Sequence, residues 1–74
     1  MKIIFNMPKP ELEVTSLFTA WEKDFADKWD VYPTCYDLIK SGKVTRKFVI
    51  EAANKICGID PAVVEMRLND FDKY

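Results

Sequence analysis

The sequence contains no histidine, which removes the most common general base and the most common zinc ligand. It also lacks a Cys-X-X-Cys pair, a glycine-rich phosphate loop and the Gly-X-Ser-X-Gly turn of serine hydrolases. Carboxylate pairs such as Asp70 with Asp72 have no ligand cluster beside them, so we interpret them as solvated helix surface. We therefore predict a protein that is not an enzyme, with no catalytic residue, metal, cofactor or small-molecule substrate.

Cysteines, glycines and long apolar runs are also few. Small secreted domains without metals usually carry four or more cysteines, so Cys35 and Cys57 are predicted to be free thiols in a reducing compartment. The apolar run at residues 3–5 is too short for a signal-peptide core or a membrane span. A formal net charge of -1 gives no overall indication of nucleic acid or an anionic membrane as partner. These features together predict a cytoplasmic protein.

What the 74 residues do contain is apolar and aromatic: 49% are hydrophobic and 14% are aromatic. Such a composition excludes intrinsic disorder as the main state, and the length fits one small domain that must bury its core efficiently. The β-branched start of the chain, followed by Pro8 and Pro10, predicts an extended or β N-terminal arm over residues 1–10. Residues 11–74 are predicted to form a single helical domain.

Apolar residues at spacings of three and four predict a long first helix over about residues 11–29. Its inward stripe consists of Val14, Leu17, Phe18, Trp21, Phe25 and Trp29. Pro33 suits the first position of a short second helix, which is expected over residues 34–40. Gly42 is expected to end this helix in the left-handed conformation.

Capping residues predict the two remaining helices. Thr45 is expected to cap a third helix over residues 46–57, and Gly58 to end it. Asp60 is expected to cap a fourth helix with Pro61 at its first position. The predicted fold is therefore all-α, with four helices and a helix-turn-helix-like unit at about residues 45–71. Its predicted core consists of Trp21, Phe25, Trp29, Phe48, Ile56, Val64 and Leu68.

The segment at residues 55–69, KICGIDPAVVEMRLN, resembles the helix-turn-helix of lac-repressor-type regulators. The order of lysine, an apolar pair, glycine, an aliphatic residue, a cap, proline, valine, leucine and asparagine is similar. The small alanine expected early in the first helix of that motif is Asn54 here, with Ala53 one place off. The positions that read bases in that family correspond to Pro61, Ala62 and Met66, and none can form bidentate hydrogen bonds to bases.

The outer face of the fourth helix is therefore predicted to bind protein. It combines small apolar and methionine side chains with a polar rim, a composition that suits protein contacts. The predicted site consists of Ala62, Val63, Glu65, Met66 and Asn69. The alternatives are that these apolar residues are merely exposed, or that they pack against residues 3–5. The predicted function is a small non-enzymatic regulator, an inhibitor or adaptor, whose partner is another protein or a second copy of the chain. Small domains of this kind are common among phage-encoded inhibitors and adaptors, an analogy of size and style.

A DNA-binding regulator is the alternative function, and it depends on a basic cluster. The cluster consists of Lys40, Lys43, Arg46, Lys47 and Lys55, with only Glu51 opposing. In a helix-turn-helix, the first helix of the motif crosses the phosphate backbone, so these side chains are the expected nucleic-acid contacts. The competing interpretation is an ordinary solvated face that balances the acidic first helix.

Overall fold

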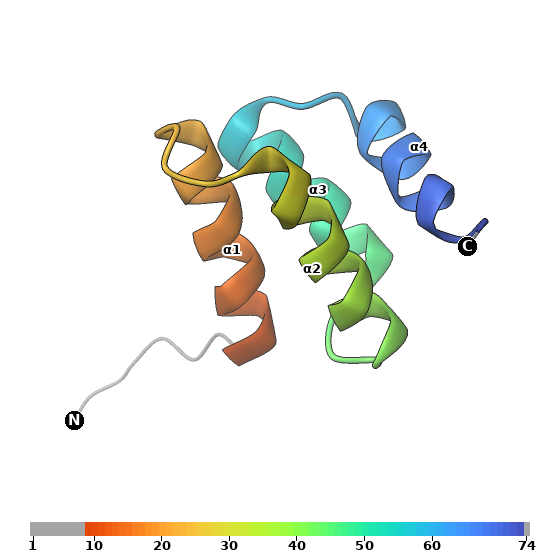
Figure 1. Ribbon diagram of the computed structural model, residues 1–74. Helices are drawn as coiled ribbons and strands as arrows, with labels where there is room; N and C mark the ends of the chain where they lie inside the picture. Colours follow the sequence, from red (N-terminus) through yellow and green to blue (C-terminus); the bar gives the residue numbers. More distant parts are fainter. Residues whose placement is uncertain (1–8, 74) are drawn as a thin grey trace.

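The computed structural model describes residues 9–73, and within that range the chain folds into four α-helices without any strand (Figure 1). The helices are α1 (Lys9–Glu22), α2 (Lys28–Lys40), α3 (Arg46–Cys57) and α4 (Pro61–Phe71). The predicted all-α class and the number of helices are confirmed. Most of the predicted N-terminal arm lies outside the described residues, but Lys9 and Pro10 already belong to α1, so the helix begins before the arm was expected to end.

The core draws on all four helices. α1 packs against α3 and α2, whereas α4 packs against α3 and α2 from the other side (Figure 1). The buried side chains are mostly small and aliphatic: Val14, Phe18, Val31, Cys35, Leu38, Val44, Val49, Ala52, Ala53, Val64 and Leu68. Among residues 9–73, no helix combines the length and the apolar character that crossing a bilayer requires.

The start and end of α3 and the start of α4 lie where the sequence predicts them. The hydroxyl of Thr45 accepts a hydrogen bond from the Phe48 N–H at 3.0 Å and so caps α3. Gly58 ends that helix with a φ of 69°, in the left-handed region. The Asp60 carboxylate accepts from the Ala62 N–H at 2.9 Å, and Pro61 opens α4. Each of these residues supplies a local partner or backbone angle that fixes a helix boundary.

The predicted end of the first helix is wrong, because α1 stops at Glu22 rather than near residue 29. Asp24 has a φ of 61°, and its N–H donates to the Trp21 carbonyl at 2.9 Å. The next N–H, that of Phe25, donates to the Ala20 carbonyl at 2.7 Å. This is the Schellman pattern that ends a helix, here with an aspartate where glycine is usual. Phe25 and Trp29 follow Trp21 at the helical spacing of four residues, although they do not belong to α1.

The second helix begins six residues earlier than predicted. The Asp27 carboxylate accepts a hydrogen bond from the Trp29 N–H at 2.9 Å, so α2 starts at Lys28. Pro33 therefore lies inside the helix, where it removes one backbone hydrogen bond. Val31 before it and Cys35 after it are both buried, and their burial stabilises the helix across the proline.

The early break also changes the aromatic core. Phe25 and Trp29 were predicted to be buried, yet they are 83% and 84% exposed. Trp21, Phe48 and Ile56 are partly buried and pack against the core, and the prediction that Val64 and Leu68 are fully buried is confirmed. Phe25 and Trp29 are not buried because α1 ends at Glu22, so neither residue lies on the inward face of that helix.

Candidate functional site

Four of the large exposed apolar side chains come from segments that meet at one end of the bundle. The end of α1, the start of α2 and the α3–α4 turn lie together at the top of Figure 1. Phe25 and Trp29 belong to the α1–α2 connection and the first turn of α2, and Val63 and Met66, exposed by 37% and 55%, belong to the first half of α4. We term Phe25, Trp29, Val63 and Met66 the apolar end. Leu12, 44% exposed, lies near the start of α1 and so at the opposite end.

Contacts between α2 and α4 place Trp29 near the start of α4. The Tyr36 and Phe71 rings have centroids 5.4 Å apart, and the Arg67 charge acts on Tyr32. Both pairs are separated by 35 residues in sequence, and the two helices run in the same direction (Figure 1). Extending this register by one turn brings the first turn of α2, which carries Trp29, beside the first turn of α4.

The connection that carries the two aromatic residues has a defined local geometry. Trp29 is held at its backbone by the Asp27 cap. The Lys28 ammonium lies 3.2 Å from the Asp24 carboxylate and 5.9 Å from the centre of the Trp21 ring. Because Trp21 in turn packs against the core, the connection is anchored while the Trp29 side chain extends into solvent.

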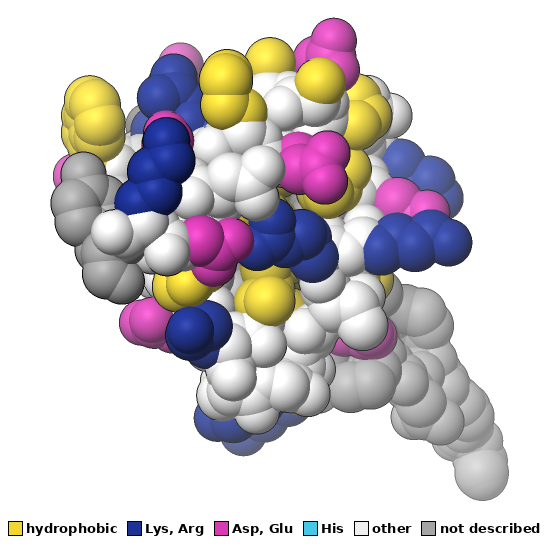
Figure 2. All heavy atoms as spheres, turned by 90° about the vertical axis from the view of Figure 1, so that its right-hand side faces the viewer, with side chains coloured by type: hydrophobic (Ala, Val, Ile, Leu, Met, Phe, Trp, Pro, Cys, Tyr) yellow, Lys and Arg dark blue, Asp and Glu magenta, His cyan; other side chains and the backbone are white. Residues whose placement is uncertain are grey.

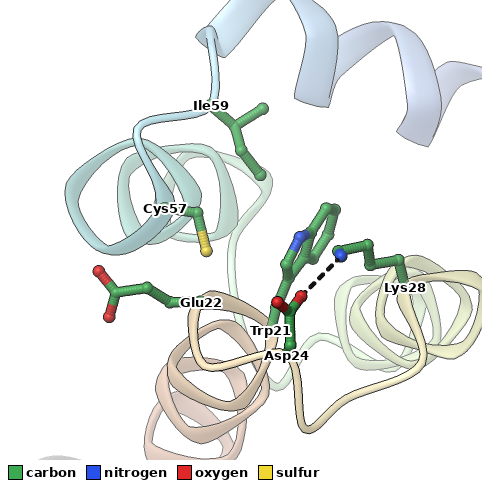
Figure 3. Close-up of a pocket in the computed structure, with 6 residues that line it drawn as sticks. All are labelled: Trp21, Glu22, Asp24, Lys28, Cys57 and Ile59. Carbon is green, nitrogen blue, oxygen red and sulfur yellow. Dashed lines mark hydrogen bonds and ion pairs between the residues drawn. The ribbon is translucent and has the colours of Figure 1, made fainter.

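A shallow hollow of about 260 Å³ lies beside this connection, between α1, α2 and the α3–α4 turn (Figure 3). Ile59 and Trp21 lie on opposite sides of it, and the Cys57 sulfur lies at one side of them. The Cys57 thiol donates to the Phe18 carbonyl at 3.2 Å. Burial, followed by the nearby Glu22 charge, raises the pKa of Cys57. The thiol is therefore protonated and weakly nucleophilic near neutral pH.

The other cysteine lies in the core. Cys35 is fully buried, and burial, followed by the Glu13 charge, raises its pKa to about 12. Both cysteines are unpaired thiols, as predicted. Cys35 therefore acts as a small apolar core residue, which agrees with the prediction for it.

The predicted binding face of α4 is exposed, but it is small. Ala62, Val63, Glu65 and Met66 lie on the surface, whereas the Asn69 amide oxygen accepts a hydrogen bond from Arg46 at 2.6 Å. Figure 2, which views the molecule from the α4 side, shows hydrophobic side chains in separate groups among acidic and basic ones. The face contributes Val63 and Met66 to the apolar end, and Asn69 links α4 to α3.

Four residues of the predicted basic cluster lie at the end of α2 and the start of α3, and Lys55 lies apart from them. The Arg46 guanidinium binds Asn69 and lies 3.0 Å from an Asp72 carboxylate oxygen, while the Tyr36 hydroxyl donates to Asp72 at 2.7 Å. The Lys40 ammonium lies 5.7 Å from the centre of the Tyr36 ring. Arg46 and Tyr36 thus link α3 and α2 to the C-terminal end of α4, through Asn69 and Asp72.

The remaining lysines of that cluster lie at the two ends of α3. Lys43 precedes α3, Lys47 lies in its first turn and Lys55 in its last, and all three are exposed. Lys47 and Lys55 are eight residues apart, which corresponds to roughly 12 Å along a helix. The structure therefore brings Lys43 and Lys47 to one end of α3 and Lys55 to the other.

The contacts of Tyr36 and Arg46 with Asp72 also shift the pKa values of Tyr36 and Asp72. The hydrogen bond from Tyr36, followed by that from Arg46, lowers the pKa of the Asp72 carboxyl. The same hydrogen bond is the main cause that raises the pKa of the Tyr36 hydroxyl. Asp72 is therefore a charged acceptor in the folded state, and the C-terminal end of α4 is fixed to the two other helices.

Phe25 and Trp29 are the site residues that the sequence prediction missed, because it assigned both to the core. The signal that could have located them is Asp27, which can cap a helix, followed three residues later by Asp30 in the first turn. Within residues 9–73, histidine, cysteine and acidic side chains form no group of three that could hold a metal ion. Comparison with protein-family models, with curated proteins and with solved structures finds no match.

Proposed function

We propose that the protein is a non-enzymatic binding module whose apolar end docks another protein. The observation that carries this proposal is the exposure of Trp29 and Phe25, 84% and 83%, on an anchored connection. Tryptophan is enriched among the few residues that dominate binding energy at protein interfaces.

The magnitudes support an interface built around these two rings. Fully burying a large apolar side chain is worth about 1.5–3 kcal/mol, so covering both rings contributes roughly 3–6 kcal/mol. Association itself costs about 4–15 kcal/mol in lost translational and rotational freedom. Val63 and Met66, at the same end of the bundle, supply additional exposed apolar area. A role as inhibitor or adaptor, in the cytoplasm where Cys35 and Cys57 stay reduced, belongs to the same proposal.

The test is partner capture by a double variant, Phe25→Ala with Trp29→Ala. Neither side chain is buried, so the variant should keep the unfolding midpoint of the parent. We expect it to lose nuclease-resistant partners from a host lysate, together with any self-association seen by sedimentation. Leu12→Ala, which alters an exposed apolar side chain at the opposite end, should retain both. Equal capture by all three proteins would exclude the apolar end as the binding surface.

The DNA-binding alternative is favoured by one observation. α3 and α4 are joined by only three residues, with Gly58 in the left-handed conformation, as in helix-turn-helix units. Lys43 and Lys47 are the exposed basic side chains that would contact phosphates. The double variant Lys43→Gln with Lys47→Gln should therefore weaken duplex binding if this function holds. Salt-sensitive retardation of a defined duplex by the parent, lost in this variant, would favour DNA over protein as the partner.

A further inference from the structure

We propose, resting on the proposed function, that the partner presents a basic segment that carries large apolar side chains. The apolar end is bordered by an excess of carboxylates. Residues 22–30, which contain Phe25 and Trp29, hold four acidic residues and two lysines, a net charge of -2. A partner that covers the rings must therefore bring its own charges close to these carboxylates.

The one ion pair within residues 22–30 leaves this net charge of -2 unchanged. The Lys28 ammonium is paired with Asp24 at 3.2 Å, so its charge is already matched. Glu22 and Asp30 are exposed, and neither belongs to an ion pair among the described residues, while Lys23 is the one lysine of residues 22–30 that is not paired with a carboxylate there. Asp60, the cap of α4, adds a further carboxylate at the same end, and Lys55 in the last turn of α3 adds a further ammonium, so the excess of carboxylates remains.

Helix dipoles do not reverse this sign. The starts of α2 and α4 meet at the apolar end, and so do the ends of α1 and α3 (Figure 1). Two partial positive and two partial negative charges therefore lie there together and largely cancel. The formal charges of the side chains set the local potential, and complementary charges at the rim of an interface steer and align the partner.

The connection between α2 and α3, at the opposite end of the molecule, has the opposite charge but no exposed large apolar side chain. Residues 40–47 contain four basic residues and no acidic one. The apolar residue among them, Val44, is buried at 6% exposure. A second copy of the chain that docked residues 40–47 onto the apolar end would complement its negative charge. It would offer no apolar side chains to cover Phe25 and Trp29. A separate basic and apolar segment fits both features.

The experiment uses the full chain and two synthetic peptides of equal length. Both carry leucine and tryptophan at the same positions, and the polar positions are all lysine in one and all glutamate in the other. We expect the lysine peptide to bind at least about tenfold more tightly in fluorescence anisotropy, with an affinity that falls as salt rises. Trp29→Ala with Phe25→Ala should abolish binding of the lysine peptide.

The charge test reverses two carboxylates, Glu22→Lys with Asp30→Lys. This variant should weaken binding of the lysine peptide by about tenfold, since each exposed charge pair has a modest effect. The matched control, Asp37→Lys with Glu51→Lys, makes the same change in net charge on exposed positions elsewhere and should bind as the parent does. Should the first variant unfold, the salt dependence and peptide preference of the parent still decide the matter.

Each outcome has a separate meaning. Equal affinity for both peptides, or equal binding by both charge variants, would overturn the inference of a basic partner. If Trp29 and Phe25 are nevertheless required for capture from lysate, the proposed function stands and only the partner class is wrong. If deletion of residues 1–8 is needed before the lysine peptide binds, the chain covers its own apolar end, and the inference of a separate partner is overturned.

Discussion

The ends of α1 and α2 form the same structure from different residues. At the end of α2, the Gly42 N–H donates to a carbonyl three residues back at 3.0 Å, and the Lys43 N–H donates five residues back at 2.9 Å. At the end of α1, the corresponding N–H groups are those of Asp24 and Phe25, at 2.9 and 2.7 Å. The left-handed φ values are 77° for Gly42 and 61° for Asp24. Glycine reveals such an end to sequence analysis, whereas aspartate conceals it.

The two ends also differ in what they do with the next apolar side chain. After Gly42 the chain returns to the core, and Val44 is buried at 6% exposure. After Asp24 the chain leaves the core, and Phe25 is 83% exposed. The usual hydrophobic contact that follows a left-handed helix end is thus absent from the end of α1. One helix end serves the packing of the bundle, and the other presents aromatic side chains to solvent.

The largest expected effect compares two phenylalanines on either side of the α1 end. Phe18 is fully buried and Phe25 is exposed, so Phe18→Ala should lower the free energy of unfolding by about 3–5 kcal/mol. Phe25→Ala should change it by less than about 0.5 kcal/mol, because little contact is lost. Denaturant unfolding followed by circular dichroism measures both. A loss of more than about 2 kcal/mol for Phe25→Ala would mean that the ring packs on the protein in solution, and the contrast between the two ends would disappear.

The next prediction concerns the backbone at the end of α2. Gly42→Val should cost about 1–2 kcal/mol in unfolding free energy, because a β-branched residue resists the left-handed conformation. A Cβ at this position would meet no atom within 4 Å, so the cost lies in the backbone angles alone. Thermal unfolding of this variant should show the same cooperativity as the parent at a lower midpoint. An unchanged midpoint would mean that this end does not need a left-handed residue.

How well the fold could be predicted depended on how each boundary is encoded. Thr45, Gly58, Asp60 and Pro61 each have a narrow structural role, and the boundaries of α3 and the start of α4 followed from them. No glycine or proline lies between residues 11 and 32, and there the apolar spacing was the only guide. It continued from Trp21 across the break, so the α1 boundary was misplaced.

The candidate site was predicted in part for the same reason. The α4 face followed from its helix, because Val63 and Met66 lie away from the buried side of α4. Phe25 and Trp29 could not be placed on the surface, since an aromatic residue at core spacing is normally buried. The engagement of Arg46 with Asp72 joins residues distant in sequence, and composition alone does not report such a pairing.

A smaller effect of opposite sign is expected at the end of α1. Asp24→Gly should raise the free energy of unfolding by about 0.5–1 kcal/mol, because relief of the left-handed strain exceeds the extra freedom of glycine in the unfolded chain. The lost ion pair with Lys28 is solvent-exposed and subtracts little. A matched change, Asp24→Ala, keeps the strain and loses the same ion pair, so it should not stabilise the protein. Destabilisation by Asp24→Gly would show that the Lys28 pair, rather than the backbone angle, fixes this end.

The smallest expected effect concerns Asp72, which links α4 to α2 and α3 through Tyr36 and Arg46. Hydrogen bonds from Tyr36 and Arg46 lower the pKa of Asp72 below its unfolded value, so the folded state is favoured wherever Asp72 is charged in both states. The resulting stability is fully present above about pH 5 and is lost as the pH falls through the lowered pKa. Asp72→Asn should therefore be less stable than the parent at neutral pH, and the difference should shrink on acidification towards about pH 2. Denaturant unfolding across this range measures the difference, and Tyr36→Phe, which removes the main donor, should reproduce part of it. A difference that stays constant with pH would mean that Asp72 acts through packing rather than through its charge, and that α3 and α4 depend on their caps alone.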